Sequence, residues 1–165
     1  EPPRAADSLA ALARLAASHG LMLGVEFMIY TSLPDLSAAR ALVQRAAQPN
    51  VRILVDTLHF MRSGAEPAAL AQGADIARDF AQFSDAPARP HRAVRPGGEA
   101  RAHRLLPGEG ALPLTQIASR ALVPGAMISV EAPSAVRRHH LDLDERASLA
   151  WRAAQSWHST LQGHL

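Results

Sequence analysis

The sequence contains no cysteine and no lysine, and each absence excludes a class of chemistry. Without cysteine the chain can form no disulfide, no zinc–thiolate site and no thiolate nucleophile. Without lysine it has neither a Schiff-base residue nor the lysine of a phosphate-binding P-loop. It also has no apolar run of about 18 residues and no basic-then-apolar leader. We therefore expect neither a membrane span nor a secretory signal, and a cytoplasmic location.

Arginine supplies all 17 basic side chains, and 15 acidic side chains leave a formal net charge of only +2. This balance does not indicate a nucleic-acid partner. The arginines cluster in residues 89–104 and at Arg137 and Arg138, where carboxylates are few. A phosphate or carboxylate ligand could be bound bidentately there, although a solvated loop is the ordinary alternative.

With 165 residues, 48% of them hydrophobic, the chain is expected to form one globular domain. Its apolar pattern alternates between helix-like and strand-like segments. Strands are predicted at 21–30, 51–56, 79–84 and 126–131, and the first is apolar enough to be covered on both faces. Helices are predicted at 7–18, 35–47, 66–77, 113–122 and 144–162, with a long loop at 86–111.

An acidic residue stands at the C-terminal end of each predicted strand, namely Glu26, Asp56, Asp85 and Glu131. Their spacing is about that of a βα unit, roughly 30 residues, with one longer interval for a loop insertion. Parallel strands place their C-terminal ends at one edge of a sheet, where α/β enzymes have their active sites. The repeat therefore predicts one site formed by these strand ends.

Several side chains near these acids suggest the chemistry of that site. Two glutamates, an aspartate and a nearby amide or imidazole would form an open, oxygen-rich ligand set for Mn2+, Mg2+ or Co2+. His59 follows Asp56 by three residues and could bind metal or substrate. Arg62 is a weaker candidate for substrate binding. Arg104 begins an R-x-x-P-G-E-G element, where a turn could let the backbone approach a ligand closely.

Four short motifs occur at these predicted strand ends and a fifth in the loop at 86–111: VEFM at Glu26, VDTLHF at Asp56, QFSDAP at Gln82, HRLLPGEG at Arg104 and SVEAPS at Glu131. In this order they resemble the xylose isomerase-like TIM barrel superfamily, especially its sugar phosphate isomerase/epimerase members. In that family they end strands five to eight of a (β/α)8 barrel. The resemblance implies that residues 1–165 are the C-terminal half of such a barrel, an α/β fold with four parallel strands alternating with helices. The first four strands, of order 100 residues, would be absent.

The resemblance also implies a role for each matching residue. The metal ligands would be Glu26, Asp56, Gln82 and Glu131, and the two glutamates would also be the catalytic acid/base pair. His59 and Arg104 would contact the substrate, a small sugar or sugar-phosphate-like polyol. The implied activity is a metal-dependent isomerase or epimerase that transfers a proton through a metal-stabilised enediolate.

Three alternatives remain open. Gln82 stands where epimerases often have histidine, and it is similar to the glutamine of some 3-dehydroshikimate dehydratases, which indicates a lyase. An apurinic endonuclease with a zinc cluster is disfavoured, because only His59 and His103 stand at expected rim positions. An inactive truncated fragment is the third. A half-barrel would leave strand edges unpaired at 21–28 and 126–131, so we expect it to form a homo-oligomer or to recruit its missing half.

Overall fold

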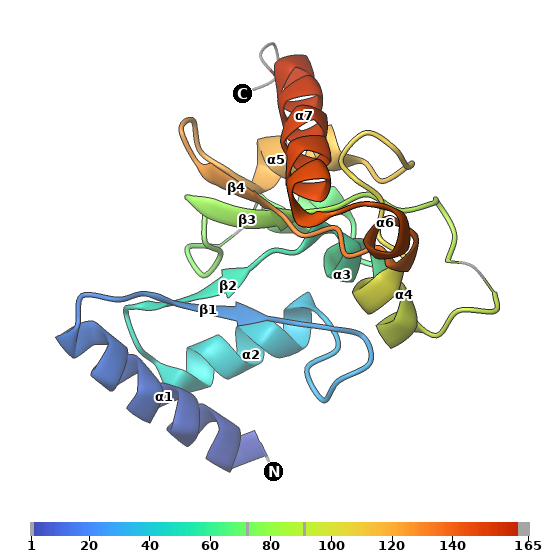
Figure 1. The fold of residues 1–165 in the computed structure, drawn as a ribbon. Coiled ribbons are helices and arrows are strands. Elements are labelled where there is room, and N and C mark those ends of the chain that lie inside the picture. Colours follow the sequence, from blue (N-terminus) through green and yellow to red (C-terminus); the bar gives the residue numbers. More distant parts are fainter. Residues whose placement is uncertain (1, 72, 91, 162–165) are drawn as a thin grey trace.

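The computed structural model describes residues 2–71, 73–90 and 92–161 (Figure 1). Its strands are β1 (Leu23–Glu26), β2 (Val51–Leu54), β3 (Phe80–Phe83) and β4 (Met127–Val130). Its helices are α1 (Pro2–Ser18), α2 (Leu36–Ala46), α3 (Thr57–Arg62), the short 3-10 helix η1 (Pro67–Leu70), α4 (Pro96–Ala102), α5 (Leu114–Ala121), α6 (Ala135–His140) and α7 (Leu143–Leu161). None of the helices in these ranges is long and apolar enough to cross a membrane.

The strands are parallel and follow one another in chain order, but they form two pairs. Strand β1 pairs with β2, and β3 pairs with β4. Between β2 and β3 the ladder shrinks to isolated bridges, one of which joins Asp56 to Gln82 through a 2.9 Å bond from the Gln82 N–H to the Val55 carbonyl. Ile76, which precedes β3 in the chain, forms an isolated parallel bridge with Ile53 of β2. We call this break between β2 and β3 the seam.

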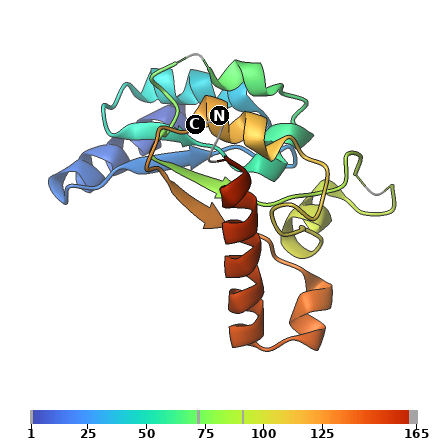
Figure 2. The same cartoon turned by 90° about the horizontal axis from the view of Figure 1, so that it is seen from above.

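The core lies between the strands and the helices on one side of them. Val51 and Ile53 of β2 and Ala81 and Phe83 of β3 are buried, whereas the alternate residues of these strands are partly exposed. In Figure 2 α1, α2 and α5 lie along one side of the strands, whereas α6 and much of α7 extend beyond the other side. This is the partial, unclosed barrel that the sequence predicts. The strands are covered on one face, however, and not on both.

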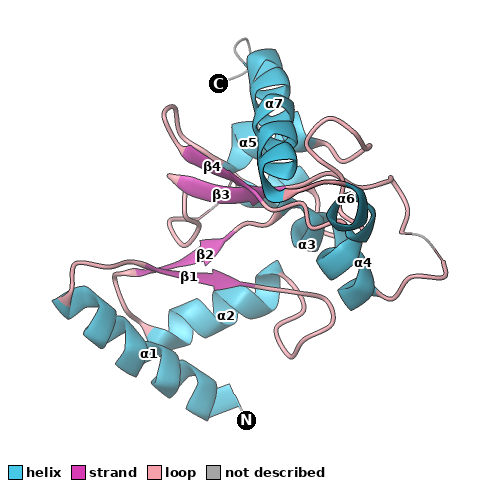
Figure 3. Cartoon of the chain, viewed as in Figure 1, coloured by secondary structure: helices cyan, strands magenta, loops and turns pink. Residues whose placement is uncertain are grey.

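The loops contain more helix than the sequence pattern predicts. The helix predicted at 66–77 is wrong: η1 is one short turn, and the real helix of this unit, α3, starts directly after β2 (Figure 3). It starts early because the Asp56 carboxylate accepts a 2.9 Å hydrogen bond from the His59 N–H as an N-cap. The loop predicted at 86–111 contains α4, and Ser134 caps the unpredicted α6. Side-chain caps therefore start α3 and α6, and α4 begins at a proline, Pro96, without a side-chain cap.

Candidate active site

The ends of the four strands bring the predicted side chains to one edge of the sheet. Glu26 is the last residue of β1, Asp56 follows β2, Gln82 lies in β3 and Glu131 directly follows β4. His59 joins them because the cap at Asp56 places it in the first turn of α3. One ligand atom from each of Glu26, Asp56 and His59 lies within 4.8 Å of the other two. The structure thus brings Glu26, Asp56 and Glu131 of the predicted acidic series to one edge, with Asp85 outside the group, and the roles of these residues stay predictions.

Arg104 lies at the centre of this group. Its side chain is 3% exposed, and its Nη1 lies 2.5 Å from Asp56 Oδ2 and 3.7 Å from Glu131 Oε2. Nε donates to the Ala100 carbonyl at 2.8 Å, which fixes the direction of the guanidinium. Arg104 follows α4 in the chain. Its guanidinium contacts Asp56 after β2 and Glu131 after β4, so it links the two strand pairs across the seam. We call Glu26, Asp56, His59, Arg104 and Glu131 the strand-end cluster.

The cluster favours protonation of its two glutamates. Burial raises the pKa of Glu26 to about 7, and the negative charges of Asp56 and Glu131 add to this effect. Burial also raises the pKa of Glu131, against the opposing effect of the Arg104 cation. The cluster contains one guanidinium and three carboxyl groups, so one positive charge would face three negative charges if all three carboxyl groups were ionised. Glu26 is therefore available to exchange protons close to neutral pH, and the pKa of Glu131 is shifted in the same direction.

The geometry determines the protonation state of His59. Its Nε2 lies 3.2 Å from Arg104 Nη2, and a guanidinium has donors only, so Nε2 accepts and the imidazole is neutral. Burial lowers the pKa of His59, opposed by the negative charge of Asp56 and supported by the positive charge of Arg104. Its Nε2 is also 3.8 Å from Glu26 Oε1. A neutral imidazole beside a carboxyl group can bind a substrate oxygen or a metal ion.

Two oxygen atoms at this edge are enclosed and unsatisfied. Among the described residues, Gln82 Oε1 and Glu131 Oε2 are buried without a hydrogen-bond partner. The Glu131 side chain as a whole is 42% exposed, so the carboxylate is open on one side and closed around Oε2. Buried acceptors without donors are uncommon, and a cation would satisfy both. These oxygens, with the carboxylates of Glu26 and Asp56, fit the ligand preference of a divalent metal ion.

A cavity of about 410 Å3 opens onto the cluster. Its walls include Glu26, His59, Arg104 and Glu131, so the acid/base groups and the candidate substrate-binding groups share one space. Tyr30, which the sequence pattern did not single out, also lines it and meets the His59 ring edge-on at 5.7 Å. The cavity is large enough for a small polyol.

The sequence profile of the family described as xylose isomerase-like TIM barrel matches residues 2–158. The chain belongs to this family. A search of curated proteins finds no match. Family membership confirms the resemblance read from the five motifs, and the parallel strands confirm the α/β fold class.

Several solved structures share this fold. The IOLI protein with a bound zinc atom is 19% identical, with a TM-score of 0.76 over 98% of this chain and 56% of that one. A D-psicose 3-epimerase studied with D-fructose is 16% identical, with a TM-score of 0.67 over 94% and 55%. The probable 3-DHS dehydratase AsbF from Bacillus anthracis is 20% identical, with a TM-score of 0.62 over 76% and 48%. The chain spans about half the length of these xylose isomerase-like relatives.

Arg62 lies apart from the strand-end cluster in this xylose isomerase-like domain. Its guanidinium forms two hydrogen bonds to Glu99, at 2.7 and 2.9 Å, and a third to the Pro87 carbonyl. It does not line the cavity that opens onto the cluster. The contacts give it a structural role, tying α3 to α4, and its predicted contact with substrate finds no support in the geometry.

Asp85 also serves the structure and not the cluster. Its carboxylate accepts backbone N–H bonds from Ala86, Gly108, Gly110 and Leu112 at 2.8 to 3.1 Å. A side chain on Gly110 would stand 2.4 Å from both Asp85 Oδ1 and the Ala86 carbonyl. The P-G-E-G turn therefore approaches Asp85 closely, and not a ligand as its glycines suggested. This anchor holds the loop that carries Arg104.

Replacing Asp85 with asparagine is expected to lower the free energy of unfolding by about 2 kcal/mol, because an amide NH2 would face N–H donors and lose their hydrogen bonds. Chemical denaturation measures the change. Asp142→Asn is the matched control, since exposed Asp142 accepts one backbone N–H, from Glu145, that asparagine can also accept. Equal stability of the two variants would contradict the anchoring role.

Proposed function

We propose that this domain carries the catalytic groups of a metal-dependent isomerase or epimerase that acts on a sugar or a sugar-like polyol. One observation carries the proposal: two carboxyl groups with raised pKa, Glu26 and Glu131, line the same cavity from different strands. Epimerisation and isomerisation need one group to remove a proton from carbon and a second to return it. The solved epimerase with the same fold supports this reaction class.

Each residue of the cluster would have a separate role in the reaction. Glu26, with a pKa of about 7, can accept or donate a proton near neutral pH, and Glu131 is its counterpart at the end of β4. Neutral His59 and the fixed Arg104 guanidinium would bind substrate oxygens and orient the reacting carbon between the two carboxyl groups. The contact with Asp56 holds the Arg104 guanidinium in the cluster. There its positive charge would stabilise the negative charge that develops on a substrate oxygen during the reaction.

A divalent metal ion would be held by Glu26, Asp56, Gln82 and Glu131. The buried oxygens of Gln82 and Glu131, which have no hydrogen-bond partner, support this ligand set. When bound, such an ion supplies positive charge that acidifies a C–H beside a carbonyl group. The bound zinc of the IOLI structure is consistent with a metal in this fold, and it leaves the identity of the ion here open.

We further propose that residues 1–165 correspond to strands five to eight of the barrel. The described strands form an unclosed sheet, and the chain spans about half of each solved relative. On this proposal the cluster supplies the reacting groups, and the first four strands would complete the wall around the substrate.

Metal binding tests the proposal. Since the raised pKa of Glu26 means that it is protonated below about pH 7, metal must displace a proton there. We expect the apparent affinity for Mn2+ to fall by up to about tenfold per pH unit below that pKa and to level off above it. Calorimetric titration between about pH 6 and about pH 8 measures this. Glu26→Gln should bind more weakly with a flatter pH dependence, and Glu66→Gln, at an exposed position, should match the unchanged protein. No metal binding at any pH would refute the ligand set.

A lyase of the 3-dehydroshikimate dehydratase type is the second candidate, and Gln82 is the observation that favours it. Its amide oxygen is buried without a hydrogen-bond partner, and a neutral metal ligand would leave that oxygen available. A solved probable 3-DHS dehydratase shares the fold. We expect Gln82→His to keep at least about a tenth of the turnover if the residue only binds metal, because imidazole suits the same ions. Complete loss measured with saturating metal would show that the amide contacts the substrate.

A further inference from the structure

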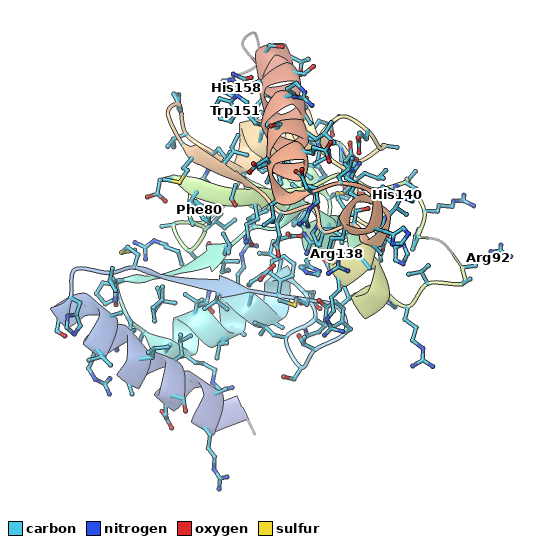
Figure 4. All side chains as sticks on the ribbon, viewed as in Figure 1. Phe80, Arg92, Arg138, His140, Trp151 and His158 are labelled. Atoms are coloured by element: carbon cyan, nitrogen blue, oxygen red, sulfur yellow. The ribbon has the colours of Figure 1, made fainter. Side chains whose placement is uncertain are left out.

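The cavity beside the cluster is also lined by two arginines that lie outside the cluster. Glu26 and Glu131 lie at the strand ends, whereas Arg101 of α4 and Arg138 of α6 line the same cavity from the helices above it. Figure 4 labels Arg138, which lies beside α6 on the side toward α4. These two arginines come from the two arginine-rich stretches of the sequence, and the proposed proton transfer gives neither of them a task.

The charge of these two arginines is not neutralised within the described residues. Arg62, Arg104 and Arg137 are each paired with a carboxylate, Glu99, Asp56 and Glu109 respectively. Across residues 2–71, 73–90 and 92–161, by contrast, the guanidinium groups of Arg101 and Arg138 have neither an ion pair nor a hydrogen bond. Both residues are exposed, so water solvates them without a ligand. A bound anion would replace that water.

Arg101 is held in place although it is exposed. Its guanidinium lies 5.7 Å from the centre of the Tyr30 ring, and Tyr30 in turn meets His59 edge-on. Both groups lie against Gly97, where a Cβ would be in ordinary van der Waals contact with Arg101 Nη1 at 3.5 Å and with the Tyr30 ring at 3.7 Å. Stacking restricts the side chain before any ligand binds, which lowers the entropy cost of binding. Tyr30 also connects Arg101 directly to the cluster.

We propose that the substrate carries an anionic group, a carboxylate or a phosphate, that Arg101 and Arg138 bind at the mouth of the cavity while its polyol end meets the cluster. Planar guanidinium groups bind both kinds of anion bidentately. A neutral sugar would leave these cations without a partner. The inference deepens the proposed function and rests on it, because it assumes that the substrate's reacting end lies at Glu26 and Glu131.

Three matched probes test the inference on the intact, metal-loaded protein: D-glucitol, D-glucitol phosphate and D-gluconate. They share a polyol chain and differ in having no anion, a phosphate or a carboxylate, and none has the ketone needed for turnover. We expect calorimetry to show that at least one charged probe binds about tenfold more tightly than D-glucitol. Arg101→Gln and Arg138→Gln should each reduce that preference and leave the affinity for D-glucitol unchanged. Arg120→Gln, an exposed arginine of α5, should change neither.

Each outcome decides between the alternatives. A preference for D-glucitol phosphate identifies a phosphorylated substrate, and a preference for D-gluconate identifies a sugar acid. Equal affinity for all three probes, no binding of any probe, or an equal effect of Arg120→Gln would overturn the inference. The proposed function is tested separately by turnover. An active Glu131→Gln variant would refute proton transfer and leave the anion preference standing, whereas equal probe affinities would leave the isomerase proposal standing.

Discussion

Asp56→Asn is expected to lower the free energy of unfolding of the metal-free protein by about 3 kcal/mol or more, because it leaves the buried Arg104 cation without its closest partner. The two groups are 2.5 Å apart, and both side chains are at most 3% exposed. Asparagine keeps the capping bond to the His59 N–H, so the substitution removes charge and little else. Relief of repulsion with Glu26 and Glu131 acts in the opposite direction, but those carboxyl groups already reduce it by taking up protons.

Asp35→Asn is the matched control for this substitution. Asp35 caps α2 by accepting a 2.8 Å bond from the Ala38 N–H, and none of its described contacts is an ion pair. Its replacement should change stability by less than about 0.5 kcal/mol. Equilibrium denaturation measures both variants, and NMR titration should show that Asp56→Asn also lowers the pKa of Glu26, since the negative charge of Asp56 raises it. Equal stabilities with an unchanged Glu26 pKa would contradict the central place of the Asp56–Arg104 pair.

On the proposed function, Glu131→Gln is expected to reduce turnover of the intact protein by about a thousandfold or more, because it would remove a proton-transfer group and a metal ligand together. The fold should persist, since the Glu131 side chain is 42% exposed and glutamine has nearly the same shape. Steady-state kinetics at saturating metal measure the first effect, and circular dichroism measures the second.

Glu109→Gln controls for the loss of a carboxylate paired with arginine elsewhere in the domain. Glu109 pairs with Arg137 in the loop after Arg104 and does not line the cavity at the cluster. Turnover should stay within a few-fold of the unchanged enzyme. If Glu131→Gln also retained activity at that level, its acid/base assignment would be wrong.

The strand ends could be predicted from sequence because two local signals coincide there. Apolar runs mark the strands, and a single acid at the end of each is costly inside such a run unless it has a polar partner, so Glu26, Asp56 and Glu131 stand out. The parallel arrangement then brings them together without further information. The spacing of these acids along the sequence thus predicts that they meet at the C-terminal edge of the sheet.

The partners of these acids could not be predicted in the same way. Arg104 meets Asp56 across 48 residues, and Arg62 meets Glu99 across 37. Nothing in the hydrophobic pattern distinguishes these two arginines, so the link that Arg62 forms between α3 and α4 could not be expected. The same limit applies to Asp85, which looked like a fourth member of the acidic series. Its carboxylate is used by the backbone of a loop more than 20 residues away.

The seam divides the residues of the candidate site between two strand pairs. Glu26 and Asp56 belong to the β1–β2 pair, Gln82 and Glu131 belong to the β3–β4 pair, and few backbone bonds join the two pairs. A cation held by residues of both pairs, whether the Arg104 guanidinium or a metal ion, adds a link across the seam to the backbone bridges and the two Thr57–Ser84 hydrogen bonds that already join the pairs. By thermodynamic reciprocity, a change that weakens the contacts across the seam lowers the binding free energy of the cation by the same amount. Binding of the cation stabilises those contacts equally.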